Sequence, residues 1–176
     1  MPSTAEAPRP APPRPIALVA ATLTRAQWHR ADNRTNCAPL ALAGDRAGGS
    51  PRAASFAGGW GIAFDQPDRR SAYGIAGVGA LPDDQLDFAE QVDRLARQWP
   101  YVRRWDAGRN LPAGSIAGYG LEGAIAYRDD NPSGVGENSV AYVRLPGQSC
   151  LYNVWSRLGR DHLMRMLSDL RFVEAR

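Results

Sequence analysis

The sequence predicts an α+β domain, in which an antiparallel β-sheet of about five to six strands is packed by two amphipathic helices in the order ββ-α-βββ-α. Three observations lead to this prediction. Several runs have an apolar residue at every second position, which is typical of half-buried strands. Two stretches carry apolar residues at helical spacing. The joints between neighbouring strands are of hairpin length, which favours antiparallel pairing, with the helices covering a face of the sheet.

The first two predicted strands form a hairpin. Residues 56–65 place large apolar side chains at every second position from Trp60 to Phe64, and residues 72–80 alternate in the same way. The segment 66–68 between them reads Gln-Pro-Asp, which has the composition of a tight turn.

A short helix is expected before this hairpin, over residues 24–31. Thr24 and Gln27 have the spacing of a capping box, in which each side chain bonds to the other residue's backbone amide. Residues 44–55 are rich in Gly, Ser, Pro and Arg, and are expected to form a loop.

The clearest predicted helix covers residues 84–99. It begins after Pro82 and Asp83, ends at Pro100, and its apolar stripe consists of Leu86, Ala89, Val92, Leu95, Ala96 and Trp99. A second helix is expected from Asp161 to Leu170, with the stripe Leu163, Met166, Leu167 and Leu170.

Three further strands are predicted between these helices. They cover residues 115–128, 139–145 and 149–157, joined by the polar segment 129–138 and by the tight Pro146-Gly147 turn. The order of all these elements, with a C-terminal helix that runs into Leu170-Arg171-Phe172, resembles the Mog1/PsbP-like fold found in small exported lipoproteins. The resemblance concerns element order and implies no functional residues.

Composition divides the 176 residues into a tether and a domain. Residues 1–15 contain six of the 14 prolines, and such a segment is expected to be a disordered, extended tether. Residues 16–176 are expected to form a single α+β domain, because neither half alone would have a core. The longest apolar run, residues 16–23, falls far short of the ~18–20 residues of a transmembrane helix.

The basic charge of the chain belongs to its N-terminal arm. The formal net charge is +3, all 21 basic residues are Arg, and the excess over Asp and Glu lies in the first 35 residues. The remainder of the chain is neutral, which argues against nucleic-acid binding. The absence of Lys excludes Schiff-base chemistry and a phosphate-loop lysine.

Cys37 and Cys150 are the only cysteines, and we expect them to form a disulfide. Closing a loop of about 100 residues stabilises a fold by up to ~4.7 kcal/mol in the chain-entropy model. Such a bond requires an oxidising compartment, which agrees with the tether. Two unpaired, buried thiols are the alternative. His29 and His162 lack the spacing of zinc ligands relative to these cysteines, so no metal is expected.

The segment 35–42, Thr-Asn-Cys-Ala-Pro-Leu-Ala-Leu, resembles the Asn-Cys-Gly-Pro-x-x-Leu stretch around the nucleophile of some papain-like cysteine peptidases. The resemblance implies an alternative function as a cysteine-dependent hydrolase, with Cys37 as nucleophile and His162 or His29 as base. Ala38 stands where the peptidases have Gly.

Two other motifs are read structurally. Residues 118–123 match G-x-G-x-x-G, but β-like residues follow where a phosphate site needs a helix. Residues 129–134 resemble the start of a calcium loop, but Val140 stands at the twelfth position in place of Glu. No cofactor is therefore expected.

Aromatic residues on the last predicted strand suggest a binding surface. Tyr152 and Trp155 fall on opposite faces of that strand, so one of them could lie outside beside Arg144 or Arg157. The alternative is that a second helix or the N-terminal arm covers that face. Taken together, the sequence favours a non-enzymatic, extracytoplasmic bacterial accessory module that binds another protein of the cell envelope, with a cytoplasmic location as the alternative.

Overall fold

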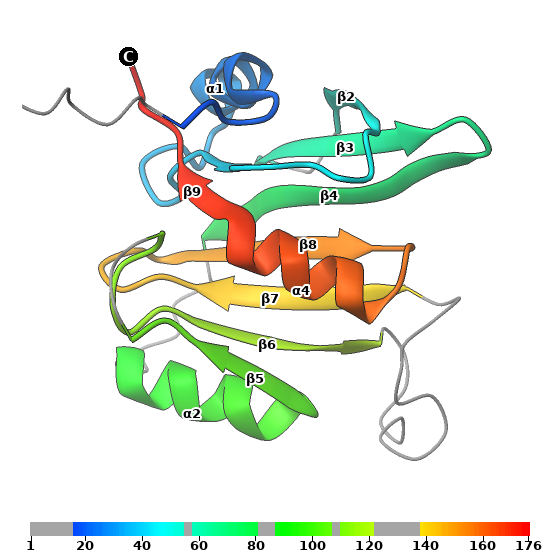
Figure 1. Cartoon of the computed structure of the whole chain (residues 1–176). Helices are drawn as coiled ribbons and strands as arrows, with labels where there is room; N and C mark the ends of the chain where they lie inside the picture. Colours follow the sequence, from blue (N-terminus) through cyan, green and yellow to red (C-terminus); the bar gives the residue numbers. More distant parts are fainter. Residues whose placement is uncertain (1–15, 55–57, 81–86, 107–109, 122–137) are drawn as a thin grey trace, which may run out of the picture.

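Antiparallel strands form the centre of this protein, whose computed structural model describes residues 16–54, 58–80, 87–106, 110–121 and 138–176 (Figure 1). The predicted α+β class with an antiparallel sheet is confirmed. The elements in chain order are α1 (Ala21–Arg30), β1 (Leu40–Leu42), β2 (Ser50–Ala53), β3 (Trp60–Gln66), β4 (Arg69–Ala80), α2 (Phe88–Gln98), β5 (Tyr101–Arg104), β6 (Ile116–Leu121), β7 (Ser139–Arg144), β8 (Cys150–Ser156), α4 (Arg160–Asp169) and β9 (Leu170–Phe172).

The main sheet has seven strands in the order β2-β3-β4-β8-β7-β6-β5, and every neighbouring pair is antiparallel. The predicted hairpins β3–β4 and β7–β8 are both present. The pairing of β4 with β8 joins the two halves of the chain, with Gly74 opposite Trp155 and Ile75 opposite Val154.

The prediction of five to six strands was too low, because it missed the short strands. The edge strand β2 lies in the segment expected to be a loop, and only Arg52 of its residues is half-buried. Pro51 is tolerated there because an edge strand can leave one side of its backbone unpaired. The other edge strand, β5, places Arg103 on its more buried face, which hides the alternation.

The remaining short strands, β1 and β9, form a separate two-stranded antiparallel sheet. It is extended on one side by the Val173 amide, which donates to the Pro39 carbonyl at 2.9 Å. Its residues Leu40, Leu42 and Leu170 are fully buried, so this sheet is part of the core. The last strand begins directly where α4 ends.

The predicted N-terminal helix exists, but its start was placed wrongly. The helix α1 begins at Ala21 after Ala20, which has a left-handed φ of 55° and gives no side-chain cap. Thr24 lies inside the helix and is 1 % exposed, so it cannot cap. The capping-box spacing was therefore misleading, because burial determined the position of Thr24.

Two helices lie on opposite faces of the main sheet, a correction to the expectation that both cover one face. Against one face packs α2, since a Cβ atom added to Gly118 of β6 would meet Leu95 and Trp99. Its N-terminus has a capping box formed by Asp87 and Glu90, which the sequence analysis did not identify, and the expected start at residues 82–86 lies outside the described residues. The other face is crossed by α4, in front of β7 and β8 in Figure 1.

The main core lies between α4, the small sheet and one face of β3, β4 and β8. Its largest fully buried side chains include Trp60, Phe64, Tyr73, Tyr152 and Leu163. The Phe64 and Tyr73 rings stack with centroids 4.7 Å apart. Aromatic side chains thus fill the space beneath the helix, as their positions on the predicted strands suggested.

Several expectations fall outside the described residues: the tether over residues 1–15, the loop 129–138 apart from Asn138, and the predicted strand beyond residue 121. Among the residues that the structure describes, no helix has the length and apolar character needed to cross a membrane.

The close approach of β8 to β4 yields a test of this packing. An alanine Cβ at Gly74 would lie closer than 3.0 Å to the Trp155 ring and to the Ile62 carbonyl oxygen. Gly74→Ala should therefore lower the free energy of unfolding by about 1–3 kcal/mol, measured by urea denaturation. The control Gly44→Ala, whose nearest neighbour is 3.8 Å away, should change it by less than about 0.5 kcal/mol. Equal stability of the two variants would contradict the packing described.

Candidate functional site

The predicted disulfide between Cys37 and Cys150 is present, with the two Cα atoms 4.9 Å apart. It joins the segment that follows α1 to the first residue of β8, across 113 positions of sequence. Both cysteines are fully buried. The bond therefore holds together two surface segments that are distant in the chain, and these segments form the walls of a groove.

The first wall consists of residues 34–39, on either side of Cys37. The Trp28 indole of α1 donates to the Cys37 carbonyl at 2.7 Å. Behind the wall, the Asn33 amide group donates to Cys37 Sγ at 3.3 Å and to the Gly77 carbonyl of β4 at 3.0 Å. The Asn33 carbonyl accepts the backbone amide of Cys37 at 2.9 Å. A side chain 9 % exposed thus ties this wall to the main sheet.

The second wall is the turn between β7 and β8, residues 147–149. Gly147 has a φ of 75°, which a glycine adopts without strain. Gln148 Oε1 accepts the Ala38 backbone amide at 3.2 Å, and also accepts the Tyr152 hydroxyl. Tyr152 in turn accepts from the Ala38 amide at 2.8 Å. Burial raises the pKa of Tyr152 above its ordinary value, so its hydroxyl stays protonated and can donate.

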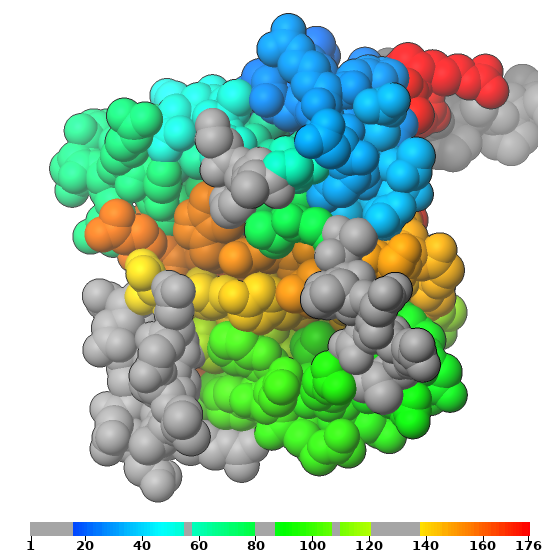
Figure 2. Space-filling model, turned by 180° about the vertical axis from the view of Figure 1, so that it is seen from behind, coloured from blue at the N-terminus to red at the C-terminus, as the bar shows by residue number. Residues whose placement is uncertain are grey.

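Between these walls lies a groove of about 330 Å³. Its lining comprises Trp28, residues 34–36, Ala38, Pro39, the turn 147–149, Val173 and Ala175. In Figure 2 the light-blue residues after α1 and the orange residues of the β7–β8 turn lie next to each other at the right. The volume falls at the lower end of the range found for small-ligand sites.

The described lining of the groove does not pair a nucleophile with a base. Among the described residues that form it there is no carboxylate, no histidine and no thiol. Cys37 lies behind the wall as half of the disulfide, so the alternative expectation of a Cys37 nucleophile applies only to a reduced protein. The structure does not bring His162 to Cys37: the imidazole lies against Ser156 and Tyr73.

His162 lies on α4 and belongs to a buried polar cluster between this helix and β8. Its Nδ1 is 2.8 Å from the Ser156 hydroxyl, which also accepts the Leu158 amide at 3.0 Å. Burial lowers the pKa of His162 below its ordinary value of 6.5, Arg165 lowers it further, and Asp45 opposes them. A cavity of about 20 Å³ beside it has room for one water molecule. This geometry positions α4 on β8.

Tyr73 connects this cluster to the segment after β1. Its hydroxyl donates to Asp45 Oδ2 at 2.5 Å and accepts the Gly49 amide at 2.7 Å. Burial, followed by the bond to Asp45, raises the pKa of Tyr73. The ring also packs edge-on against His162, with centroids 4.8 Å apart.

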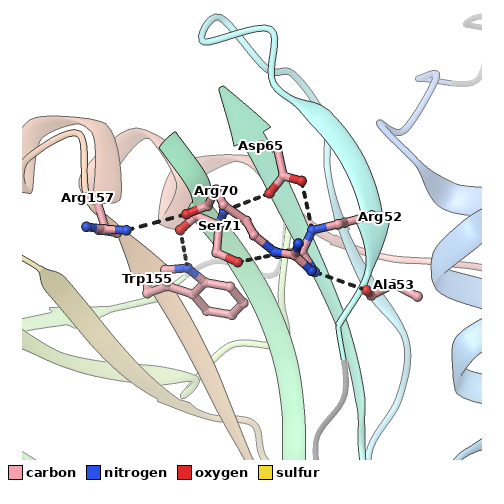
Figure 3. A network of polar contacts seen from close by, with 7 residues as sticks. All are labelled: Arg52, Ala53, Asp65, Arg70, Ser71, Trp155 and Arg157. Carbon is pink, nitrogen blue, oxygen red and sulfur yellow. Dashed lines mark hydrogen bonds and ion pairs between the residues drawn. The ribbon is translucent and has the colours of Figure 1, made fainter. Parts of the chain in front are cut away.

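Trp155 takes part in a polar network at the N-terminal end of β4 (Figure 3). Its indole donates to the Ser71 carbonyl at 3.3 Å, and Asp65 Oδ1 accepts the Ser71 amide at 2.7 Å. Arg52 bonds to the Ser71 hydroxyl and pairs with Asp65 at 2.8 Å. Three of these four bonds end on Ser71, which has a left-handed φ of 51°, so the network stabilises a strained residue near the start of β4. The Ser71 amide and then Arg52 lower the pKa of Asp65.

The four side chains of the expected binding surface do not lie together. Tyr152 is fully buried in the main core, and Arg144 is 2 % exposed on the opposite face, where it bonds to Gln91 of α2. Trp155 shares that face and is half-buried. Of the four, Arg157 is the exposed one, and its guanidinium donates to the Arg70 carbonyl at 3.4 Å.

Sequence reasoning missed the groove residues Trp28, Gln148 and Val173. The turn that carries Gln148 was predicted, but its bond to Ala38 spans 110 positions, and no local pattern signals such a pairing.

Within the described part of the chain, no cluster of three or more His, Cys, Asp or Glu could hold a metal ion. No protein-family model, curated protein or solved structure matches the chain, so the groove is interpreted from its own chemistry.

The disulfide is expected to contribute a large part of the stability. Cys37→Ala combined with Cys150→Ala should lower the free energy of unfolding by roughly 2–5 kcal/mol, because the unfolded chain loses its long closed loop. Urea denaturation of both proteins measures the loss. Labelling with a thiol reagent in denaturant should modify neither sulfur of the unreduced protein and both sulfurs after reduction. Labelling of both without reduction would contradict the bond.

The buried His162 predicts a pH dependence of stability. Its pKa is lower in the folded protein, so the unfolded chain binds more protons as the pH falls below 6.5. The free energy of unfolding should therefore fall as the pH decreases through 6.5 towards 5, as equilibrium unfolding can measure. His162→Asn should flatten this slope, whereas His29→Asn, on the exposed end of α1, should keep it. A slope unaffected by His162→Asn would refute the assignment.

Proposed function

We propose that this protein is a non-enzymatic binding module of an extracytoplasmic bacterial compartment, and that it binds another protein of the cell envelope through the groove between residues 34–39 and 147–149. The observation that carries the proposal is the construction of this groove. Its two walls flank the two half-cystines, so the disulfide fixes their separation before any ligand arrives. A preformed site loses less conformational entropy on binding.

The chemistry of the lining supports binding rather than catalysis. Its polar side chains are Arg34, Thr35, Asn36, Gln148 and Ser149, and its apolar part includes Trp28, Pro39 and Val173. Mixed apolar walls with a few polar groups that fix orientation are typical of ligand sites. A hydrolase would need an activated nucleophile with a base in reach, and the described lining has neither.

The compartment is part of the proposal. A buried disulfide supports it, because such bonds persist in oxidising environments and are rare in the cytosol. The Mog1/PsbP-like topology expected from the element order belongs to the same proposal, and the helix α4 that runs directly into β9 supports it.

Selection from a random peptide library displayed on phage tests whether the groove binds protein segments. The native, disulfide-bonded chain should enrich peptides whose binding is lost in Ser149→Trp, where an indole fills the groove from an exposed wall position. The matched control is Ser50→Trp on the exposed edge of β2, which should keep binding. Peptides that bind both variants equally, or a library that yields no binder, would refute the proposed function.

A further inference from the structure

The polar groups that the groove offers to a ligand are mainly hydrogen-bond donors. Gln148 Oε1 is occupied by the Ala38 amide and by the Tyr152 hydroxyl. Its Nε2 group lies on the other side of the amide and bonds to no acceptor in the described part of the chain. The amide of Gln148 is therefore oriented, with two donor hydrogens left for a ligand.

Asn36 is arranged in the same way on the opposite wall. Its Oδ1 accepts the Thr35 hydroxyl at 3.1 Å, while its Nδ2 has no acceptor among the described residues. In both Asn36 and Gln148 the amide oxygen accepts a hydrogen bond within the protein. The amide nitrogens, one on each wall, remain available as donors to a ligand. A ligand that satisfies both must present acceptors on two sides.

The charge of the groove also favours a ligand that presents hydrogen-bond acceptors. Arg34 is the only charged side chain among the described lining residues, and it is exposed. One of its nitrogens makes a long bond of 3.4 Å to the Ala31 carbonyl. The salt bridge found among the described residues, Arg52–Asp65, does not involve Arg34 or any other residue of the groove. The other N–H groups of the Arg34 guanidinium can donate to a ligand. A carboxylate suits them, because it can accept two parallel hydrogen bonds from one guanidinium.

The apolar part of the lining limits the class of ligand further. Trp28, Pro39 and Val173 give the groove a hydrophobic side, and the Trp28 indole nitrogen is already bonded to Cys37. A ligand therefore needs an apolar group next to its carboxylate and carbonyl acceptors. A peptide with an acidic residue beside a leucine-like residue has all three, whereas an acidic sugar chain lacks the apolar side chain.

We infer that the groove recognises an acidic peptide segment of the partner, with its carboxylate on Arg34, its backbone carbonyls on Asn36 and Gln148, and a neighbouring apolar side chain against the half-buried Trp28 ring. This inference rests on the proposed function and gives it a ligand class. It also accounts for the asymmetry of the lining, in which one cation and two free amide donors meet no carboxylate.

The test uses the native full chain and three capped peptides, acetyl-Gly-Leu-X-Leu-Gly-amide, in which X is Glu, Gln or Lys. Titrations into isotope-labelled protein are followed by NMR at the side-chain resonances of Gln148 and Trp28. The Glu peptide should bind about two- to fivefold more tightly than the Gln peptide, as expected for an ion pair to an exposed arginine. The Lys peptide should bind most weakly, and added salt should reduce the preference for Glu.

Two arginine variants separate recognition from general charge. Arg34→Gln should remove the preference for Glu over Gln, while Arg97→Gln, which deletes an exposed arginine of α2, should preserve it. A preference that survives Arg34→Gln would overturn the inference. Both variants keep the disulfide and the core, because each replaces an exposed side chain.

The outcomes distinguish the inference from the proposed function. If the three peptides shift the groove resonances equally, the groove binds peptides but the acidic ligand is wrong. If a tetragalacturonate oligosaccharide shifts them and no peptide does, the ligand is an acidic glycan, and both the peptide inference and the protein partner are wrong. If no probe at millimolar concentration shifts them and the phage library yields no binder, the groove is not a binding site.

Discussion

The disulfide between Cys37 and Cys150 is the constraint on which both the fold and the groove depend. It connects the segment after α1 with the start of β8, and thereby holds the N-terminal helix and the small β1–β9 sheet against the main sheet. The same bond sets the distance between the two walls of the groove. Stability and the shape of the candidate site therefore have a common physical cause. The bond that closes the long loop also holds residues 34–39 and 147–149 next to each other.

The polar side chains around the disulfide have a consistent arrangement. The Ala38 amide donates to both Tyr152 and Gln148 on one side of the first wall. On the other side, the Asn33 side chain bonds this wall to the Gly77 carbonyl. Each of these bonds uses a group in or near the core to position backbone at the surface. The side-chain donors that remain, on Asn36 and Gln148, have no acceptor among the described residues, while the acceptor oxygens of the same amides are held by the protein. In both amides the oxygen bonds within the protein, and the nitrogen is the group that the proposed ligand would contact.

The expected aromatic surface on β8 has another role in the structure. Trp155 covers Gly74 and donates to Ser71, and together with Arg52 and Asp65 it stabilises a left-handed residue next to the β3–β4 turn. The sequence placed Tyr152 and Trp155 on opposite faces correctly, but it could not show that the sheet is covered on both faces. Tyr152 lies on the face that α4 and the small sheet cover, whereas Trp155 lies on the other face, against Gly74 and the Ser71 carbonyl of β4.

The sequence by itself determined the α+β class, the two hairpins and the helices of the second half, and it favoured a disulfide between the only two cysteines over two unpaired thiols. These features follow from local periodicity, turn composition and cysteine number, which are readable without the fold. Only the tertiary structure decided the edge strands β2 and β5, the start of α1 and the groove. Strand β2 has no buried face to produce an alternation, Thr24 is placed by burial rather than capping, and Gln148 meets Ala38 across 110 residues. Contacts of that range depend on how the whole chain packs, so no segment of the sequence contains them.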